Sequence, residues 1–199
     1  DEAVDAASEV GYPVVLKAVS PDVVHKTDAG AVQVDLRSSA EVSDAYRDIL
    51  VSVSQHDADA RVTGMLVERY EREGREVIIG MSTEPRFGPI LMFGLGGIHV
   101  EALKDVSFRV HPVTRADADD MIRKIKGYSI LQGIRGEQPA DMDMLATTIQ
   151  RISQLVEDHE SITELDINPF LAKGTGGTAL DARISLLGKD SVPPSYRDR

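Results

Sequence analysis

The sequence contains no cysteine and no tryptophan among its 199 residues. Without cysteine the chain has no disulfide framework, no thiol nucleophile and no thiolate ligand for a metal, and nothing in this composition separates it from a protein of the reducing cytoplasm. Aromatic residues make up 5% of the chain, which leaves few rings on which the bases of a single-stranded nucleic acid could stack.

Basic residues are also scarce, because 22 lysines and arginines stand against 33 aspartates and glutamates, for a formal net charge of -11. This balance argues against nonspecific binding to nucleic acid or to an anionic membrane. No apolar run approaches the ~20 residues of a membrane span, and the first residues lack the basic start of a signal peptide. We therefore expect a cytoplasmic protein without nucleic-acid or membrane partners, in which any anionic ligand is held by backbone amides, a few placed cations or a metal ion.

The apolar pattern predicts an α+β protein of two lobes. Residues 1–62 form the smaller lobe, with the end of a helix at Val10, strands at 14–19 and 31–36, and a helix that runs to about Ser54. The first helix has no capping sequence before it, so we expect this lobe to be truncated at its N-terminus. Residues 63–188 form the larger lobe, and 189–199 read as a linker or tail. The larger lobe is expected to contain strands at 65–68, 75–81, 89–94, 162–166 and 178–181 and helices at 115–126 and 142–158.

A strand over Phe87–Gly94 runs into Leu95, Gly96 and Gly97. Glycines at a strand end let the backbone approach a ligand and point N–H groups at an anion. A tight turn with positive φ explains them equally well, and both interpretations stay open. The segment matches neither the phosphate-binding loop of P-loop enzymes nor a dinucleotide fingerprint.

A second candidate site is acidic. Glu164, Asp166 and Asn168 alternate along one predicted strand, and a hairpin would bring Asp181 opposite them. Such oxygen ligands suit Mg²⁺, which takes one or two protein oxygens and completes its shell with phosphate and water. A solvated strand face is the simpler alternative, but the flanking apolar residues imply a buried hairpin in which the carboxylates would repel one another without a cation.

Among the cations, Lys17 lies inside an apolar strand, where its charge is costly unless the ammonium reaches solvent or an anion. His25 lies in a polar loop beside Lys26, and Arg109 lies in a later strand. A single histidine in a loop is more often structural than catalytic. No nucleophilic serine motif accompanies these residues, so a serine hydrolase has no support.

Several segments occur in a fixed order along the chain. They are GYPVVLK at 11–17, SPD at 20–22 with HKTD at 25–28, FGP at 87–89 with GLGG at 94–97, LQGIRG at 131–136, and DINP at 166–169 with DAR at 181–183. Together they resemble the ATP-grasp domain, or beta chain, of the nucleoside-diphosphate-forming acyl-CoA synthetases, of the ADP-forming acetate-CoA ligase type. The resemblance runs from about Gly11 to Leu186 and departs at Ala31, where a second glycine is expected.

The resemblance implies an ATP-grasp fold, with ATP in a cleft between the two lobes. The γ-phosphoryl group would pass to a histidine of a CoA-binding domain or alpha subunit, and then to an acyl phosphate on the way to acyl-CoA. In this scheme Lys17 contacts the α- and β-phosphates, and Glu68 with its neighbours forms the adenine hinge. Glu76 meets the ribose or the metal cluster, and Gly96 and Gly97 line the path of the phosphate.

The remaining implied roles concern the metal and the transferred group. Asn168 and Asp181 would ligate Mg²⁺, and Asp166 would face the phosphohistidine. His25 would be a second phosphate carrier, and Arg109 would line the phosphate path. The implied cofactors are thus ATP and Mg²⁺, and the implied assembly is a hetero-oligomer or a longer chain.

Two other functions fit the same fold. One is a succinyl-CoA synthetase beta chain, in which we do not expect the HKTD segment at 25–28. The other is a regulatory ATP-grasp module fused to a protein acetyltransferase. The acyl group and the choice between ATP and GTP stay open, because acid recognition is expected in the partner domain.

Overall fold

The computed structural model describes residues 1–23, 26–97, 105–134 and 136–188. The chain divides into two compact units, Asp1–Arg72 and Glu73–Arg199. The division falls ten residues later than the boundary expected near residue 62, because the strand at Gly64–Arg69 pairs within the first unit. The expected tail, 189–199, lies outside the described residues.

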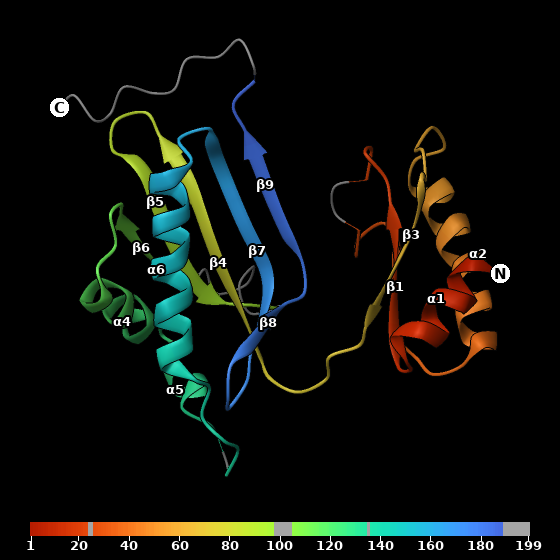
Figure 1. Ribbon diagram of the computed structural model, residues 1–199, viewed down its shortest axis with the longest axis horizontal. Coiled ribbons are helices and arrows are strands. Elements are labelled where there is room, and N and C mark those ends of the chain that lie inside the picture. The colour runs from red at the N-terminus through yellow and green to blue at the C-terminus, as the bar shows by residue number, and fades with distance from the viewer. Residues whose placement is uncertain (24–25, 98–104, 135, 189–199) are drawn as a thin grey trace. The chain divides into compact units, whose positions relative to one another are not determined.

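The first unit contains one three-stranded antiparallel sheet and two helices (Figure 1). Its strands follow the order β2-β1-β3. Along the chain its elements are α1 (Glu2–Val10), β1 (Val14–Val19), β2 (Val32–Leu36), α2 (Ser39–His56) and β3 (Gly64–Arg69).

Helix α2 shows how the sequence builds this unit. Its N-cap residue Ser38 accepts a hydrogen bond from the Glu41 amide at 3.3 Å, and the Glu41 carboxylate accepts one from the Arg37 amide at 2.8 Å. The apolar residues of α2 recur at helical spacing along one face, and Val42, Ala45, Ile49 and Val53 are all buried. Burial of each larger aliphatic side chain contributes about 1.5–3 kcal/mol, so the stripe holds α2 against the sheet.

The second unit contains a six-stranded antiparallel sheet (Figure 1). Its order is β6-β5-β4-β7-β8, with β9 also paired to β7. Its elements are β4 (Arg75–Glu84), β5 (Gly88–Leu95), β6 (Val106–Val110), α4 (Arg115–Lys124), α5 (Tyr128–Leu131), α6 (Met142–Asp158), β7 (Ile162–Ala172), β8 (Gly177–Ala179) and β9 (Ala182–Leu186).

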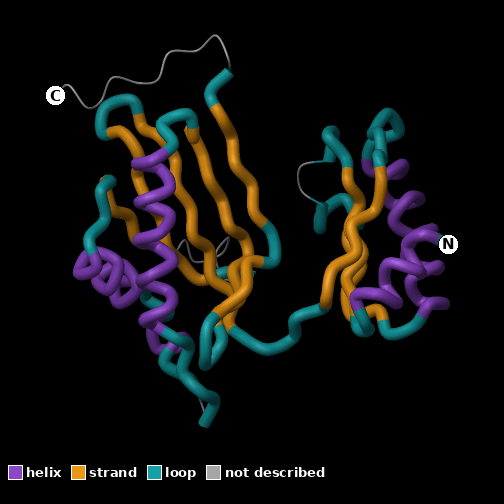
Figure 2. The backbone as a smooth tube through the Cα atoms, viewed as in Figure 1, coloured by secondary structure: helices purple, strands orange, loops and turns teal. Residues whose placement is uncertain are grey.

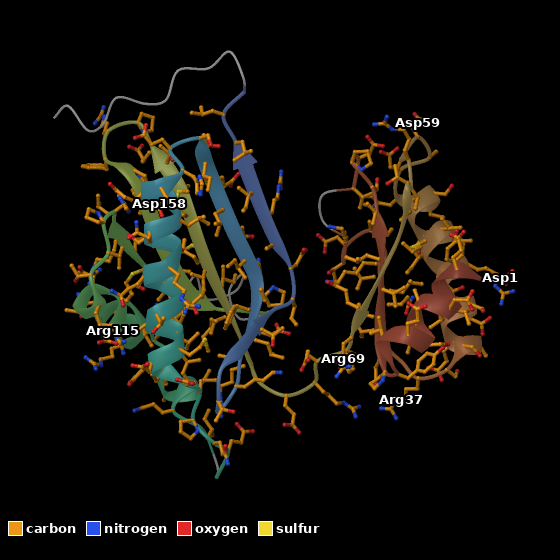
Figure 3. The ribbon with its side chains drawn as sticks, in the orientation of Figure 1. Asp1, Arg37, Asp59, Arg69, Arg115 and Asp158 are labelled. Carbon is orange, nitrogen blue, oxygen red and sulfur yellow. The ribbon has the colours of Figure 1, made fainter. Side chains whose placement is uncertain are left out.

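The two faces of this sheet differ. Helices α4 and α6 lie on one face (Figure 2), where Val77, Ile79 and Phe93 join the buried core. Arg115 of α4, which is labelled in Figure 3, ties the two helices together, because its guanidinium lies 2.5 Å from the Asp143 carboxylate of α6. Successive side chains of a strand point to opposite faces of the sheet. The residues directly before and after these core residues therefore point to the opposite face, which is called the second face below.

The antiparallel pairing and the separate helices confirm the expected α+β class. The helix expected at 142–158 is confirmed to the residue, and β7 continues beyond the expected strand through Pro169. In the part of the chain that the structure describes, no helix is both long and apolar enough to cross a membrane.

Candidate functional site

The acidic candidate site forms on the hairpin of β7 and the segment after β8. The Asn168 amide donates a hydrogen bond to the Asp181 carbonyl at 3.2 Å, and the Leu180 amide donates one to the Pro169 carbonyl at 3.0 Å. The Asp181 carboxylate accepts a hydrogen bond from the Ala182 amide at 3.0 Å. The predicted hairpin is therefore confirmed, and it places Asp181 opposite Asn168.

Asp166 is the half-buried member of this group. Burial raises the pKa of its carboxyl group, and the charges of Glu164 and Asp181 raise that pKa further. A hydrogen bond from the Asn168 side chain and the charge of Arg183 act in the opposite direction. The carboxylates of Glu164, Asp166 and Asp181 therefore influence one another, and negative charge is in excess around Asp166.

The donors of this neighbourhood are oxygens, which suit Mg²⁺ rather than a softer metal. Among the described residues, no three histidine, aspartate or glutamate side chains are already gathered to hold a metal ion. Mg²⁺ does not require such a cage, because it commonly uses one or two protein oxygens and takes the others from phosphate and water. Asn168 and Asp181 therefore fit a magnesium ion that arrives with a phosphate ligand.

The glycine segment at the end of β5 passes against Glu76 of β4. The Gly96 amide donates a hydrogen bond to the Glu76 carbonyl at 2.7 Å. A Cβ at Gly96 would lie 2.8 Å from the Glu76 carbonyl carbon, and one at Gly97 would lie 2.9 Å from its Oε2. Gly97 also has a φ of 70°, in the region that favours glycine. Glycine at 96 permits the close approach to the Glu76 backbone, and glycine at 97 permits the positive φ that places residue 97 beside the Glu76 carboxylate.

Asp105, directly before β6, anchors the backbone there, and no local pattern in the sequence marks it as a functional or structural residue. The residue is 4% exposed, and its carboxylate accepts hydrogen bonds from the amides of Lys126 at 2.5 Å and Gly127 at 2.6 Å. It thereby joins the start of β6 to the start of α5. An aspartate between a lysine and a valine gives no sequence signal for a buried anchor, because its partners are backbone amides more than twenty residues away.

Lys17 and Glu68 meet on the sheet of the first unit. The Lys17 Nζ lies 2.6 Å from the Glu68 Oε2, and the two side chains are 14% and 39% exposed. Lys17 is paired with Leu66 across β1 and β3, and Glu68 with Val15. The half-buried lysine of the apolar strand thus has an acidic partner, and the Glu68 carboxylate points at Lys17.

Arg109 is placed apart from the acidic hairpin of its own unit. It pairs with Leu91 in the sheet, and its guanidinium contacts Asp120 and, at 3.9 Å, Asp117 of α4. Arg109 therefore lies on the helix-covered face, whereas Asp166 pairs with Gly80 and lies on the second face. The structure does not bring these two candidates together, and His25 lies outside the described residues.

A comparison with protein families identifies the fold. The family model described as an ATP-grasp domain matches residues 1–186. The chain belongs to the ATP-grasp family. The two α+β units are therefore the lobes of an ATP-grasp domain, and the expected resemblance to this family is confirmed.

The ATP-grasp chain has close relatives among named acyl-CoA ligases. It is 47% identical over 186 residues to the beta subunit of the ADP-forming acetate-CoA ligase I of Pyrococcus furiosus, covering 94% of this chain and 80% of that one. It is 50% identical over 187 residues to the ADP-forming 4-hydroxybutyrate-CoA ligase of Nitrosopumilus maritimus, covering 93% of this chain. The chain spans 27% of the length of that second ligase.

A solved structure agrees with the sequence relatives. The acetyl-coenzyme A synthetase 1 of Ca. Korarchaeum cryptofilum, in complex with coenzyme A and Ca-AMPCP, superposes with a TM-score of 0.89 at 46% identity. The match covers 94% of this chain and 81% of that one. The ATP-grasp fold is thus shared with a protein that was solved with an adenine nucleotide analogue.

Proposed function

We propose that this ATP-grasp chain is the ATP-binding part of an ADP-forming acyl-CoA ligase. The observation that carries the proposal is the 47% identity to a ligase beta subunit of which the chain covers 80%. The similarity to a succinate-CoA ligase beta subunit of Haloarcula marismortui is lower, at 28% over 185 residues, and favours the acetate type.

In the proposed reaction, the γ-phosphoryl group of ATP passes to a histidine of a CoA-binding partner domain or alpha subunit, and ADP leaves. The phosphoryl group then moves to a carboxylic acid, and the CoA thiol displaces phosphate from the acyl phosphate. Transfer of this kind depends on placed cations and backbone donors rather than on a covalent residue of the ATP site. The chain would thus bind and orient ATP, while the partner carries the phosphohistidine and the acyl chemistry.

Lys17 is the proposed cation for the α- and β-phosphates. Its stem crosses the apolar surface of β1, and its ammonium already contacts a carboxylate, so it is placed to hold an anion. The backbone beyond Glu68 would form the adenine hinge. In the second unit, Glu76 would meet the ribose or the metal, and Gly96 and Gly97 would bring the backbone close to the phosphates.

Asn168 and Asp181 are the proposed Mg²⁺ ligands, and Asp166 would face the phosphohistidine. A bound Mg²⁺ supplies positive charge that stabilises the transferring phosphoryl group. The same charge would favour the ionised form of Asp166, whose pKa is raised first by burial and then by the charges of Glu164 and Asp181. Arg109 was assigned to the phosphate path, but its ion pairs with α4 favour a structural role. His25 stays a proposed second phosphate carrier.

Calorimetric titration with MgATP tests the proposal. The chain should bind MgATP, and Asn168→Ala and Asp181→Ala should each weaken that binding at least fivefold, because each removes a metal oxygen. Gln154→Ala is a matched control, since this exposed side chain on α6 bonds to Asp158 and lies on the helix-covered side of the sheet. Wild-type affinity in both hairpin variants would contradict the proposed metal site.

A further inference from the structure

The contact between Lys17 and Glu68 carries an inference beyond the binding roles proposed above. The two side chains come from adjacent strands, β1 and β3, and their charged atoms lie 2.6 Å apart. Lys17 is the more buried of the two, at 14% exposure against 39% for Glu68. An ammonium held so far from water is costly unless an anion accompanies it.

The surroundings of the pair are apolar. Lys17 lies between Val15 and Val19 along β1 and opposite Leu66 of β3. Val19 and Leu66 are 44% and 46% exposed, so apolar surface flanks the charges on the accessible side. Charges attract each other more strongly next to an apolar surface than in water, because the effective dielectric constant is lower there. The anion that contacts the Lys17 ammonium therefore affects which ligands bind at this position.

The two candidate anions for Lys17 are therefore in competition. In the structure the Glu68 carboxylate contacts the ammonium, and a nucleotide phosphate would need the same hydrogen-bond donors. A phosphate that approached Lys17 would either displace the carboxylate or share the ammonium with it. An uncharged ligand such as adenosine would face no such competition.

We propose that Glu68 is a positioning residue that controls the preference of the site for phosphorylated nucleotides, by holding Lys17 until a phosphate replaces the carboxylate. The inference rests on the proposed function, because it requires Lys17 to bind nucleotide phosphate. It gives the Glu68 side chain a role separate from the adenine hinge, which its backbone and neighbours would form. It also explains why the lysine of an apolar strand has a carboxylate for a partner.

The test is a double-mutant cycle on the complete chain. Dissociation constants for ATP and for adenosine are measured by competition with a fluorescent ATP analogue, for the wild type, Glu68→Gln, Lys17→Met and the double variant. Glu9→Gln is the matched control, because it removes one exposed glutamate charge from α1 of the same unit. Thermal unfolding of each variant confirms that it is folded.

Glu68→Gln should tighten ATP binding about threefold to fivefold, the range expected for release of a partly exposed ion pair. Adenosine binding should not change, and Glu9→Gln should alter neither ligand. In the Lys17→Met background the gain on ATP should vanish, because the competition acts through the ammonium.

Three results would overturn the inference. A gain on ATP that persists without Lys17 would mean that Glu68 merely repels phosphate. Weaker ATP binding in Glu68→Gln would mean that the carboxylate helps to bind the nucleotide. Equal loss of ATP and adenosine in Lys17→Met would remove the phosphate role of Lys17 itself, and so would contradict this part of the proposed function as well.

Discussion

Gly97→Ala, compared with a second glycine variant, tests whether the position beside Glu76 affects nucleotide binding as well as stability. Gly97 has a φ of 70°, and a Cβ there would lie 2.9 Å from the Glu76 Oε2. Gly136 is a matched control, because its φ of 89° is also positive but a Cβ there meets nothing within 4 Å. Either alanine should lower the free energy of unfolding by about 1–2 kcal/mol, because its backbone is held in the left-handed region. Each kcal/mol lost should lower Tm by about 2–4 °C.

The two variants should differ in what they do to the nucleotide. Gly97→Ala must move the Glu76 carboxylate, so MgATP binding should weaken by about fivefold, the value of one lost hydrogen bond. Gly136→Ala should lower Tm by a similar amount and leave MgATP affinity unchanged. Thermal unfolding and calorimetric titration measure both quantities. Equal affinities for the two variants would contradict the proposed role of Gly97 and the adjacent Glu76 in nucleotide binding.

Three further predictions follow from buried or crowded charges. Asp166→Asn should raise Tm at pH 7 without Mg²⁺ by up to about 4 °C, since it removes a half-buried charge that lies near the like charges of Glu164 and Asp181, and crowded like charges on a sheet cost ~0.2–1 kcal/mol. Because the pKa of Asp166 is raised in the folded state, its charge destabilises the fold at pH values above the ordinary carboxyl pKa. The gain in Tm should therefore disappear below about pH 4, and a gain in Tm that is independent of pH would contradict this. Asp105→Ala should lower stability by about 2–4 kcal/mol in denaturant unfolding, because two backbone amides lose their buried acceptor, and a loss under 1 kcal/mol would show that the anchor is dispensable. Arg109→Gln should lower Tm without changing MgATP affinity, whereas a selective loss of affinity would return Arg109 to the phosphate path.

Local patterns predicted much of the fold. The helix α2 was expected to run to about Ser54, and it extends from Ser39 to His56 with an apolar face at helical spacing and a serine N-cap, both of which are local features of the sequence. The hairpin that joins Asn168 to Asp181 was predictable from alternation and from a glycine-rich turn. These features depend on neighbours in the sequence, so the sequence alone was enough to find them.

Other features depend on partners distant in the chain. The strand at Gly64–Arg69 was expected in the larger lobe, but it pairs with β1, which no local pattern specifies. Arg109 was expected near the phosphates, yet its strand register turns it toward Asp117 and Asp120 of a helix that follows it. The contact between Lys17 and Glu68 likewise requires knowledge of which strands are adjacent.

The proposed function requires that ATP is cleaved to ADP by way of a phosphorylated histidine in a partner domain. The most direct measurement combines the chain with its CoA-binding partner, ATP, Mg²⁺, CoA and acetate, and identifies the products by chromatography and phosphorus NMR. ADP, phosphate and acetyl-CoA should form together in equal amounts, and omission of the partner should abolish acetyl-CoA. AMP with pyrophosphate, or acetyl-CoA made by the chain alone, would contradict the account.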